Sequence, residues 1–231
     1  MWTAPDPLTY NKYYSGYGMC QPIKILLMVI ESHQFSPRDI IGGDAALDFV
    51  NTVGGSDQSP RDWLDSYARL VQWAALVRLL PEKTLRALAE KDRNEPATGA
   101  TALARAKMLR EALFALVTKI ISGGAPPKDA LVLLREHWIA GVNAHELRFG
   151  DGRVSTELRK DASDLDLIAS MIGYRMVHYV FPIPKERLRI CQGSDCSWLF
   201  IDSSKAGRRR WCDMALCGNI AKSRRFQERW H

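Results

Sequence analysis

The residues most suited to chemistry are four cysteines near the C-terminus, spaced as two C-x4-C pairs. The pairs are Cys191 with Cys196 and Cys212 with Cys217. Short pairs supply two thiolates from one tight turn, and a structural zinc ion takes four thiolates in a tetrahedron. Two disulfides or four buried thiols are the alternatives, but disulfides need an oxidising compartment and paired spacing argues against simple burial. We therefore expect one Zn²⁺ held by all four cysteines, in a structural site with no position free for water.

The segments around the cysteines are expected to complete a small module. Residues 198–201 have the pattern of a strand, residues 203–207 that of a turn, and residues 209–211 that of a returning strand. A helix is expected after Cys217. This order of knuckle, hairpin, knuckle and helix predicts a treble-clef-like zinc finger.

The net positive charge of the chain lies in the same module. The formal net charge is +6, and residues 181–231 carry all of it, so the rest of the chain is neutral overall. Arginine forks and lysine ammonium groups bind phosphates, which makes nucleic acid the expected partner, although part of this charge also offsets the zinc thiolates. On a strand, Arg209 faces away from Arg208 and Arg210, so we expect one of the three to serve the metal site. The residues expected to contact nucleic acid are Arg208, Arg209, Arg210, Asn219, Lys222, Arg224, Arg225 and Arg229.

The elements that precede the module have a mainly helical pattern. Apolar residues recur at helical spacing, and Pro, Gly and capping side chains mark the helix ends. The expected helices cover residues 45–51, a segment from 61, a segment from 81, residues 102–122, residues 128–142, and a segment from 163 that ends at Pro182 and Pro184. The turn Gly150-Asp151-Gly152 lies between two short alternating runs and predicts a β-hairpin over residues 145–155. The sequence thus predicts an α+β chain: a mostly α-helical N-terminal domain with a small β-hairpin, followed by the finger.

Individual side chains are expected to fix these helices. Asp44 can cap the first helix, and Ser163 with Asp166 can form a capping box for the last. The apolar face of the helix over residues 128–142 is expected to include Leu131, Leu134 and Trp138.

A second candidate site lies in the first helix. Asp48 and Asn51 are three positions apart and therefore share a helix face, with apolar neighbours on both sides. They are candidates for a small-molecule pocket. The alternative is capping and core hydrogen bonding, which buried polar groups need in any protein.

Two runs of the sequence resemble known families. The run C-S-W-L-F-I-D-S-S-K-A-G-R-R-R-W-C-D-M-A-L-C-G-N-I-A-K closely resembles the CGNR-type zinc finger of bacteria, except that Ile220 stands where the arginine of that motif is expected. The run G-G-D-A-A-L-D-F-V-N-T over residues 42–52 resembles the start of the ABATE domain, which usually precedes this finger. The resemblance implies an N-terminal extension over residues 1–39, a helical ABATE-like domain over 40–183, and the finger over 184–231. It also implies a stress-linked transcription regulator.

Composition and missing motifs narrow the function further. The chain has no phosphate-binding loop, dinucleotide fingerprint or nucleophile elbow, so an enzyme is not expected. The apolar run over residues 23–30 is much too short to span a bilayer, and no clear export signal is present, so we expect a cytoplasmic protein. We expect its natural start at Met28, and an ordered edge strand over residues 23–30 is the alternative. The predicted function is zinc-dependent binding of nucleic acid, foremost duplex DNA, by a regulator whose N-terminal domain senses a small molecule or partner. RNA binding and a protein-interaction module remain the alternatives, and a homodimer is compatible with the sequence.

Overall fold

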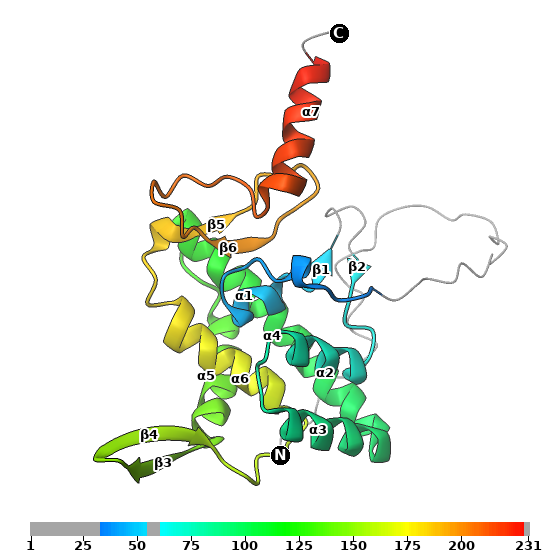
Figure 1. The fold of residues 1–231 in the computed structure, drawn as a ribbon, viewed down its shortest axis with the longest axis vertical. Coiled ribbons are helices and arrows are strands. Elements are labelled where there is room, and N and C mark those ends of the chain that lie inside the picture. Colours follow the sequence, from blue (N-terminus) through cyan, green and yellow to red (C-terminus); the bar gives the residue numbers. More distant parts are fainter. Residues whose placement is uncertain (1–32, 55–60, 229–231) are drawn as a thin grey trace, which may run out of the picture. The chain divides into compact units, whose positions relative to one another are not determined.

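The computed structural model describes residues 33–54 and 61–228 (Figure 1). Most of the expected N-terminal extension, with its proposed start at Met28 and its apolar run over residues 23–30, lies outside the described residues. Arg229 lies outside them as well.

Helices dominate the part of the chain that precedes the finger, as the sequence predicts. They are α1 (Ala45–Val50), α2 (Tyr67–Leu76), α3 (Glu82–Asn94), α4 (Pro96–Ser122), α5 (Lys128–Asn143) and α6 (Leu167–Arg175). Their ends follow local chemistry: the Asp44 carboxylate accepts from the backbone N–H of Ala46 at 2.8 Å, and Gly123 ends α4 in a left-handed conformation with φ of 74°. The predicted α+β class with a mainly helical N-terminal part is confirmed.

Three predicted helix starts are wrong. Helix α4 begins at Pro96 rather than at residue 102, because a proline suits the first helical turn. The second helix begins at Tyr67 rather than at residue 61, because Ser66 caps it and Arg61–Asp62 form the short strand β2. Asp62 is held there by the buried guanidinium of Arg110 from α4, through contacts of 2.8 and 2.9 Å. The last helix begins at Leu167 without the predicted capping box, and it continues into a π-helical turn, Met176–Val180.

The backbones of α5 and α6 approach each other closely at two glycines. A Cβ on Gly141 would lie 2.5 Å from the carbonyl oxygen of Ser170, and one on Gly173 would lie 3.0 Å from the backbone nitrogen of Trp138. The buried residues of α5 are Ala130, Leu134, His137 and Gly141. The predicted inward position of Leu131 is therefore wrong, and its side chain is exposed.

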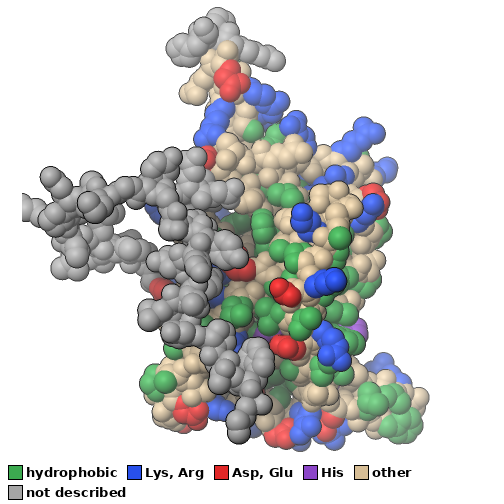
Figure 2. All heavy atoms as spheres, turned by 180° about the vertical axis from the view of Figure 1, so that it is seen from behind, with side chains coloured by type: hydrophobic (Ala, Val, Ile, Leu, Met, Phe, Trp, Pro, Cys, Tyr) green, Lys and Arg blue, Asp and Glu red, His purple; other side chains and the backbone are tan. Residues whose placement is uncertain are grey.

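The strands form three separate antiparallel pairs in the described chain. They are β1 (Val53–Gly54) with β2, β3 (His145–Gly150) with β4 (Arg153–Leu158), and β5 (Leu188–Ile190) with β6 (Leu199–Ile201). The predicted hairpin over residues 145–155 is confirmed, and hydrophobic side chains gather over it at the lower right of Figure 2. The predicted returning strand over residues 209–211 is wrong, because β6 pairs with β5 instead. Among the described residues, no helix is both long and apolar enough to cross a membrane.

Candidate metal centre and basic surface

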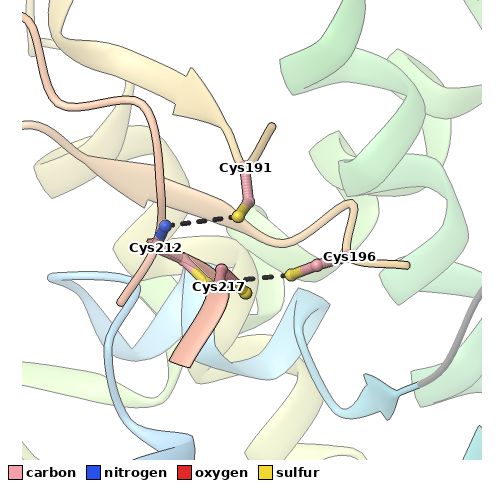
Figure 3. Close-up of side chains that lie close together, drawn as sticks. All are labelled: Cys191, Cys196, Cys212 and Cys217. Atoms are coloured by element: carbon pink, nitrogen blue, oxygen red, sulfur yellow. Dashed lines mark hydrogen bonds between the residues drawn. The ribbon is translucent and has the colours of Figure 1, made fainter. Parts of the chain in front are cut away.

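The four finger cysteines converge in space, as Figure 3 shows. All four Sγ atoms lie within 4.8 Å of one another. The Sγ atom of Cys212 is 3.7 Å from that of Cys196 and 3.7 Å from that of Cys217. Cys191 and Cys212 are buried, whereas Cys196 and Cys217 are partly exposed.

These sulfur distances can be compared with the two chemistries that four cysteines offer. Zinc–sulfur bonds of about 2.3 Å place the corners of a tetrahedron about 3.8 Å apart, which matches the 3.7 Å between these sulfur atoms. A disulfide needs sulfur atoms about 2 Å apart, and all four thiols are free. The donor set therefore fits a tetrahedral, thiophilic cation and does not form two disulfides.

The surroundings of Cys191 favour its thiolate. The backbone N–H groups of Cys212 and Gly193 donate to its Sγ at 3.3 and 3.4 Å. Contacts from the Cys196 and Cys212 thiols, together with these N–H groups, hold the pKa of Cys191 far below its ordinary value. Contact with Cys191 in turn raises the pKa of Cys196 and Cys212. Neighbouring thiols thus oppose one another's ionisation, and all four could lose their protons together only around a cation, which a metal ion would supply.

The first cysteine pair lies in the turn between β5 and β6. Cys191 follows β5 directly, and its backbone N–H donates to the carbonyl of Trp198 at 2.9 Å, which extends the ladder past the strands. The turn is tight, because a Cβ on Gly193 would lie 3.2 Å from the Cβ of Cys196. The loop of this β-hairpin therefore holds two of the four cysteines. The hairpin itself lies earlier in the chain than the predicted one over residues 198–211.

The second cysteine pair, Cys212 and Cys217, lies where a helical segment begins. Asp213 accepts from the backbone N–H groups of Ala215 and Leu216 and caps the π-helical turn Met214–Gly218. Cys212 precedes this cap, and Cys217 lies one turn later. Helix α7 (Asn219–Glu228) follows directly. The order of knuckle, second pair and helix is that of a treble clef, which confirms the predicted finger class.

The three consecutive arginines have different surroundings. Arg209 is partly buried, lies 4.7 Å from the centre of the Phe200 ring, and donates to the backbone carbonyls of Trp211 and Cys212. Arg210 is exposed and donates to Gln192 at 2.7 Å. Arg208 is exposed, and its side chain makes no hydrogen bond or ion pair with the other described residues. Arg209 thus holds the backbone at Trp211 and Cys212, while the charge of Arg208 faces solvent.

Helix α7 presents the remaining basic residues. Arg224 is paired with Asp195 at 2.9 Å, and Arg225 donates to the carbonyl of Ala221. Lys222 is exposed and forms no ion pair within the described part of the chain. Asn219 donates to the carbonyl of Ala215 at 3.0 Å, and Ile220 is 51% exposed. A side chain at position 220 therefore meets solvent rather than a core.

Hydrogen bonds tie the finger to α1 and its flanks. The Asn51 amide donates to the carbonyl of Leu199 and accepts from its N–H, both at 2.8 Å. Trp198 donates to the carbonyl of Val53 at 3.0 Å, and the N–H of Ile201 donates to the carbonyl of Gly42 at 2.8 Å. Asn51, expected as a pocket residue, thus faces β6.

Asp48 has a different hydrogen-bond partner from Asn51. Its carboxylate accepts from the N–H of Gly42 at 2.7 Å, and burial raises its pKa to about 6, although hydrogen bonds from Gly42 and Ile41 oppose the shift. It lines a hollow of about 360 Å³. The other residues around this hollow are Ile40, Gly43, Asp44, Ala45, Val77, Leu79 and Arg175.

Two family models match the chain. The model described as "Putative stress-induced transcription regulator", the ABATE domain, matches residues 43–173, and the CGNR zinc finger model matches residues 187–230. The chain belongs to this ABATE–CGNR family. No curated protein matches the chain. The CGNR match contains all four clustered cysteines, and the ABATE match begins beside the Gly42 carbonyl that holds β6.

The ABATE helices and the CGNR finger share one hydrophobic cluster. Leu188 of β5 and Leu199 of β6 are buried in the same cluster as the helices, while Phe200 forms a second, smaller cluster with the cysteines. The sequence alone does not reveal this shared core between the helices and the finger. The available signal was Asn51 itself, because a polar side chain amid apolar neighbours needs a partner, but its partner lies 148 positions away.

Proposed function

We propose that this chain is a transcription regulator whose finger is folded by one Zn²⁺ and binds duplex DNA. The observation that carries the proposal is the convergence of four sulfur atoms at tetrahedral spacing, directly before a helix with exposed basic side chains. Cys191, Cys196, Cys212 and Cys217 would hold the ion, and its role would be structural because four thiolates complete the coordination. Free thiols fit a reducing compartment, so we place the protein in the cytoplasm.

The zinc part of the proposal is tested by metal content. Purified chain should contain about one zinc per molecule, since four thiolates complete one tetrahedral site. Cys212→Ser should remove it and unfold the finger, because the binding free energy of such sites, on the order of 10 kcal/mol, is also folding free energy. Cys20→Ser, which changes the cysteine outside the cluster, is the matched control. A metal-free chain with a folded finger would contradict the proposal.

The DNA part rests on the basic groups that the fold leaves available. Arg209 and Arg224 are engaged within the finger. The exposed side chains of Lys205, Arg208 and Lys222 make no hydrogen bond or ion pair with other residues that the structure describes. Phosphate contacts of this kind supply most sequence-independent affinity for duplex DNA. Asn219, and Arg229 beyond the described residues, stay predicted contacts, with Arg210 and Arg225 as further candidates.

A salt titration with labelled duplex tests this assignment. The logarithm of affinity should fall linearly with the logarithm of salt, by about 0.9 per phosphate contact. Changing Lys205, Arg208 and Lys222 together to alanine should flatten the slope by about 2 to 3 and leave the zinc content unchanged. The same change at Lys83, Lys128 and Arg135, exposed residues of the helical part, is the charge-matched control.

Other outcomes of this titration would favour the alternatives. Stronger binding to single-stranded or structured RNA than to duplex DNA would favour an RNA target. No binding to nucleic acid at low salt would favour a protein partner with an acidic surface.

We also propose that the ABATE part senses a small effector at the hollow beside Asp48. Its volume is at the lower end of the range for ligand sites, and it combines apolar walls with the Asp44–Arg175 ion pair of 2.6 Å. A ligand there would contact the segment that also carries Gly42 and Asn51, which hold the finger. Asp48→Leu should abolish the shift in melting temperature caused by any effector found in a compound screen, while Asn94→Leu should not.

A further inference from the structure

The β3–β4 hairpin carries an apolar face that the described chain does not cover. Leu147, Phe149 and Val154 are 75%, 78% and 63% exposed. In the observed register Phe149 is opposite Val154 and Leu147 is opposite Thr156, so these side chains share one face. The hydrophobic side chains at the lower right of Figure 2 belong to this region. A two-stranded hairpin is marginally stable alone in water, so this one is expected to gain a partner.

The hydrogen-bonding direction of β4 is fixed by its two ends. The turn Asp151-Gly152 has φ values of 52° and 72°, which is a two-residue turn of the type that closes hairpins. At the other end the N–H of Arg159 donates to the carbonyl of Ala144 at 2.9 Å. Odd-numbered residues of β4 therefore bond to β3, and the N–H and C=O groups of Val154 and Thr156 point to the free edge.

The charges along β4 are complementary to a second copy of the same strand. If two β4 edges pair antiparallel with Ser155 opposite Ser155, each Arg153 faces a Glu157, and each Val154 faces a Thr156. The outward groups of Val154 and Thr156 then form the new ladder. Arg153 and Glu157 fall at the non-hydrogen-bonded positions, where side chains approach most closely.

The charges within one hairpin are arranged to accept this partner. Glu146 and Glu157 are directly opposite each other, and the single guanidinium of Arg148 serves both, at 2.7 and 3.7 Å. Arg153 is exposed and forms no ion pair with another described residue. An arginine from a second copy would add the cation that this pair of carboxylates lacks.

We propose that the chain forms a two-fold dimer through antiparallel β4–β4 pairing, which produces a four-stranded sheet ordered β3–β4–β4–β3. The apolar face then runs across both copies, with Val154 beside the Thr156 and Val154 of the partner. This interface lies on the helical part and is independent of metal or nucleic acid binding by the finger.

The test is a charge exchange followed by sedimentation equilibrium of the full chain. Arg153→Glu and Glu157→Arg should each weaken dimerisation at least about tenfold, because each like-charge pair occurs twice across the two-fold axis. The double variant R153E/E157R restores opposite charges and should recover the dimer. Thr156→Pro removes an edge donor without removing a β3–β4 hydrogen bond, and it should also produce monomers.

Several results would overturn the proposal. One is a parent chain that stays monomeric up to its solubility limit. Another is a dimer whose affinity neither single charge reversal changes. A third is that the single variants are folded monomers but the double variant does not dimerise either. Circular dichroism and melting temperature establish that each variant is folded. Pairing of this edge with an extended segment of another protein would appear as a monomeric parent chain, and would equally contradict self-pairing.

Discussion

Replacing Asn51 with leucine tests how firmly the finger is attached to α1. Leucine has a similar volume but cannot hydrogen-bond, so the variant leaves the N–H and C=O of Leu199 without the two 2.8 Å contacts they now have. Asn51 is 2% exposed and Leu199 is fully buried, so water does not readily replace the lost amide. Each buried unsatisfied group costs about 1 to 3 kcal/mol, which gives an expected loss of about 3 kcal/mol in the free energy of unfolding.

Urea denaturation followed by far-ultraviolet circular dichroism and tryptophan fluorescence measures this loss. Fluorescence is informative because Trp198 donates to Val53 and packs edge-on against Trp63, with ring centres 5.5 Å apart. Asn94→Leu, at the exposed end of α3, is the control and should change stability by less than about 0.5 kcal/mol. A loss below about 1 kcal/mol for Asn51→Leu would refute the argument that these hydrogen bonds join the two parts.

Three further predictions concern the helical part. Asp48→Asn should stabilise the protein by about 3 kcal/mol at neutral pH and by little below pH 4. The reason is that burial raises the pKa of this carboxyl to about 6, so between about pH 4 and 6 the folded chain keeps a proton that the unfolded chain loses. The stability of the parent chain should therefore fall as the pH rises through this window, which denaturation at several pH values would reveal. Gly141→Ala should cost about 1 to 3 kcal/mol in thermal or urea unfolding, because its Cβ would meet the Ser170 carbonyl at 2.5 Å, whereas Gly124→Ala, where the nearest atom is in a flexible lysine, should cost less. A chain ending at residue 183 should unfold at a lower urea concentration than the full chain, because it loses the buried side chains of Leu188 and Leu199. Equal urea midpoints would mean that these two leucines do not stabilise the helical part.

Features that local sequence determines were predictable. The doubled C-x4-C spacing indicated which thiols converge, because each pair lies in one short turn. Asp44 caps α1 as expected, and the turn Asp151-Gly152 closes the expected hairpin, since both depend on neighbours only a few positions away.

Features that depend on distant partners were not predictable. Leu131 is exposed because α5 approaches α6 through Gly141 and the backbone beside His137, and hydrophobicity does not mark a glycine as part of a contact face. Residues 209–211 have an adequate strand pattern, but β6 takes β5 as its neighbour, and one pattern cannot select between two partners. The start of α2 was misplaced because Asp62 pairs with Arg110, which lies 48 positions along the chain.

The separation between Asn51 and Leu199 affects the order in which the protein is completed on the ribosome. At roughly 5 to 20 residues per second, about 7 to 30 seconds pass between the synthesis of Asn51 and that of the strand with which its amide bonds. During that interval the segment that includes Gly42 and Asn51 lacks its partners, whereas the contacts among α3, α4 and α5 can form as these helices emerge. The nascent helical part therefore becomes complete only after β6 has been synthesised, so its maturation depends on the finger that follows it in the chain.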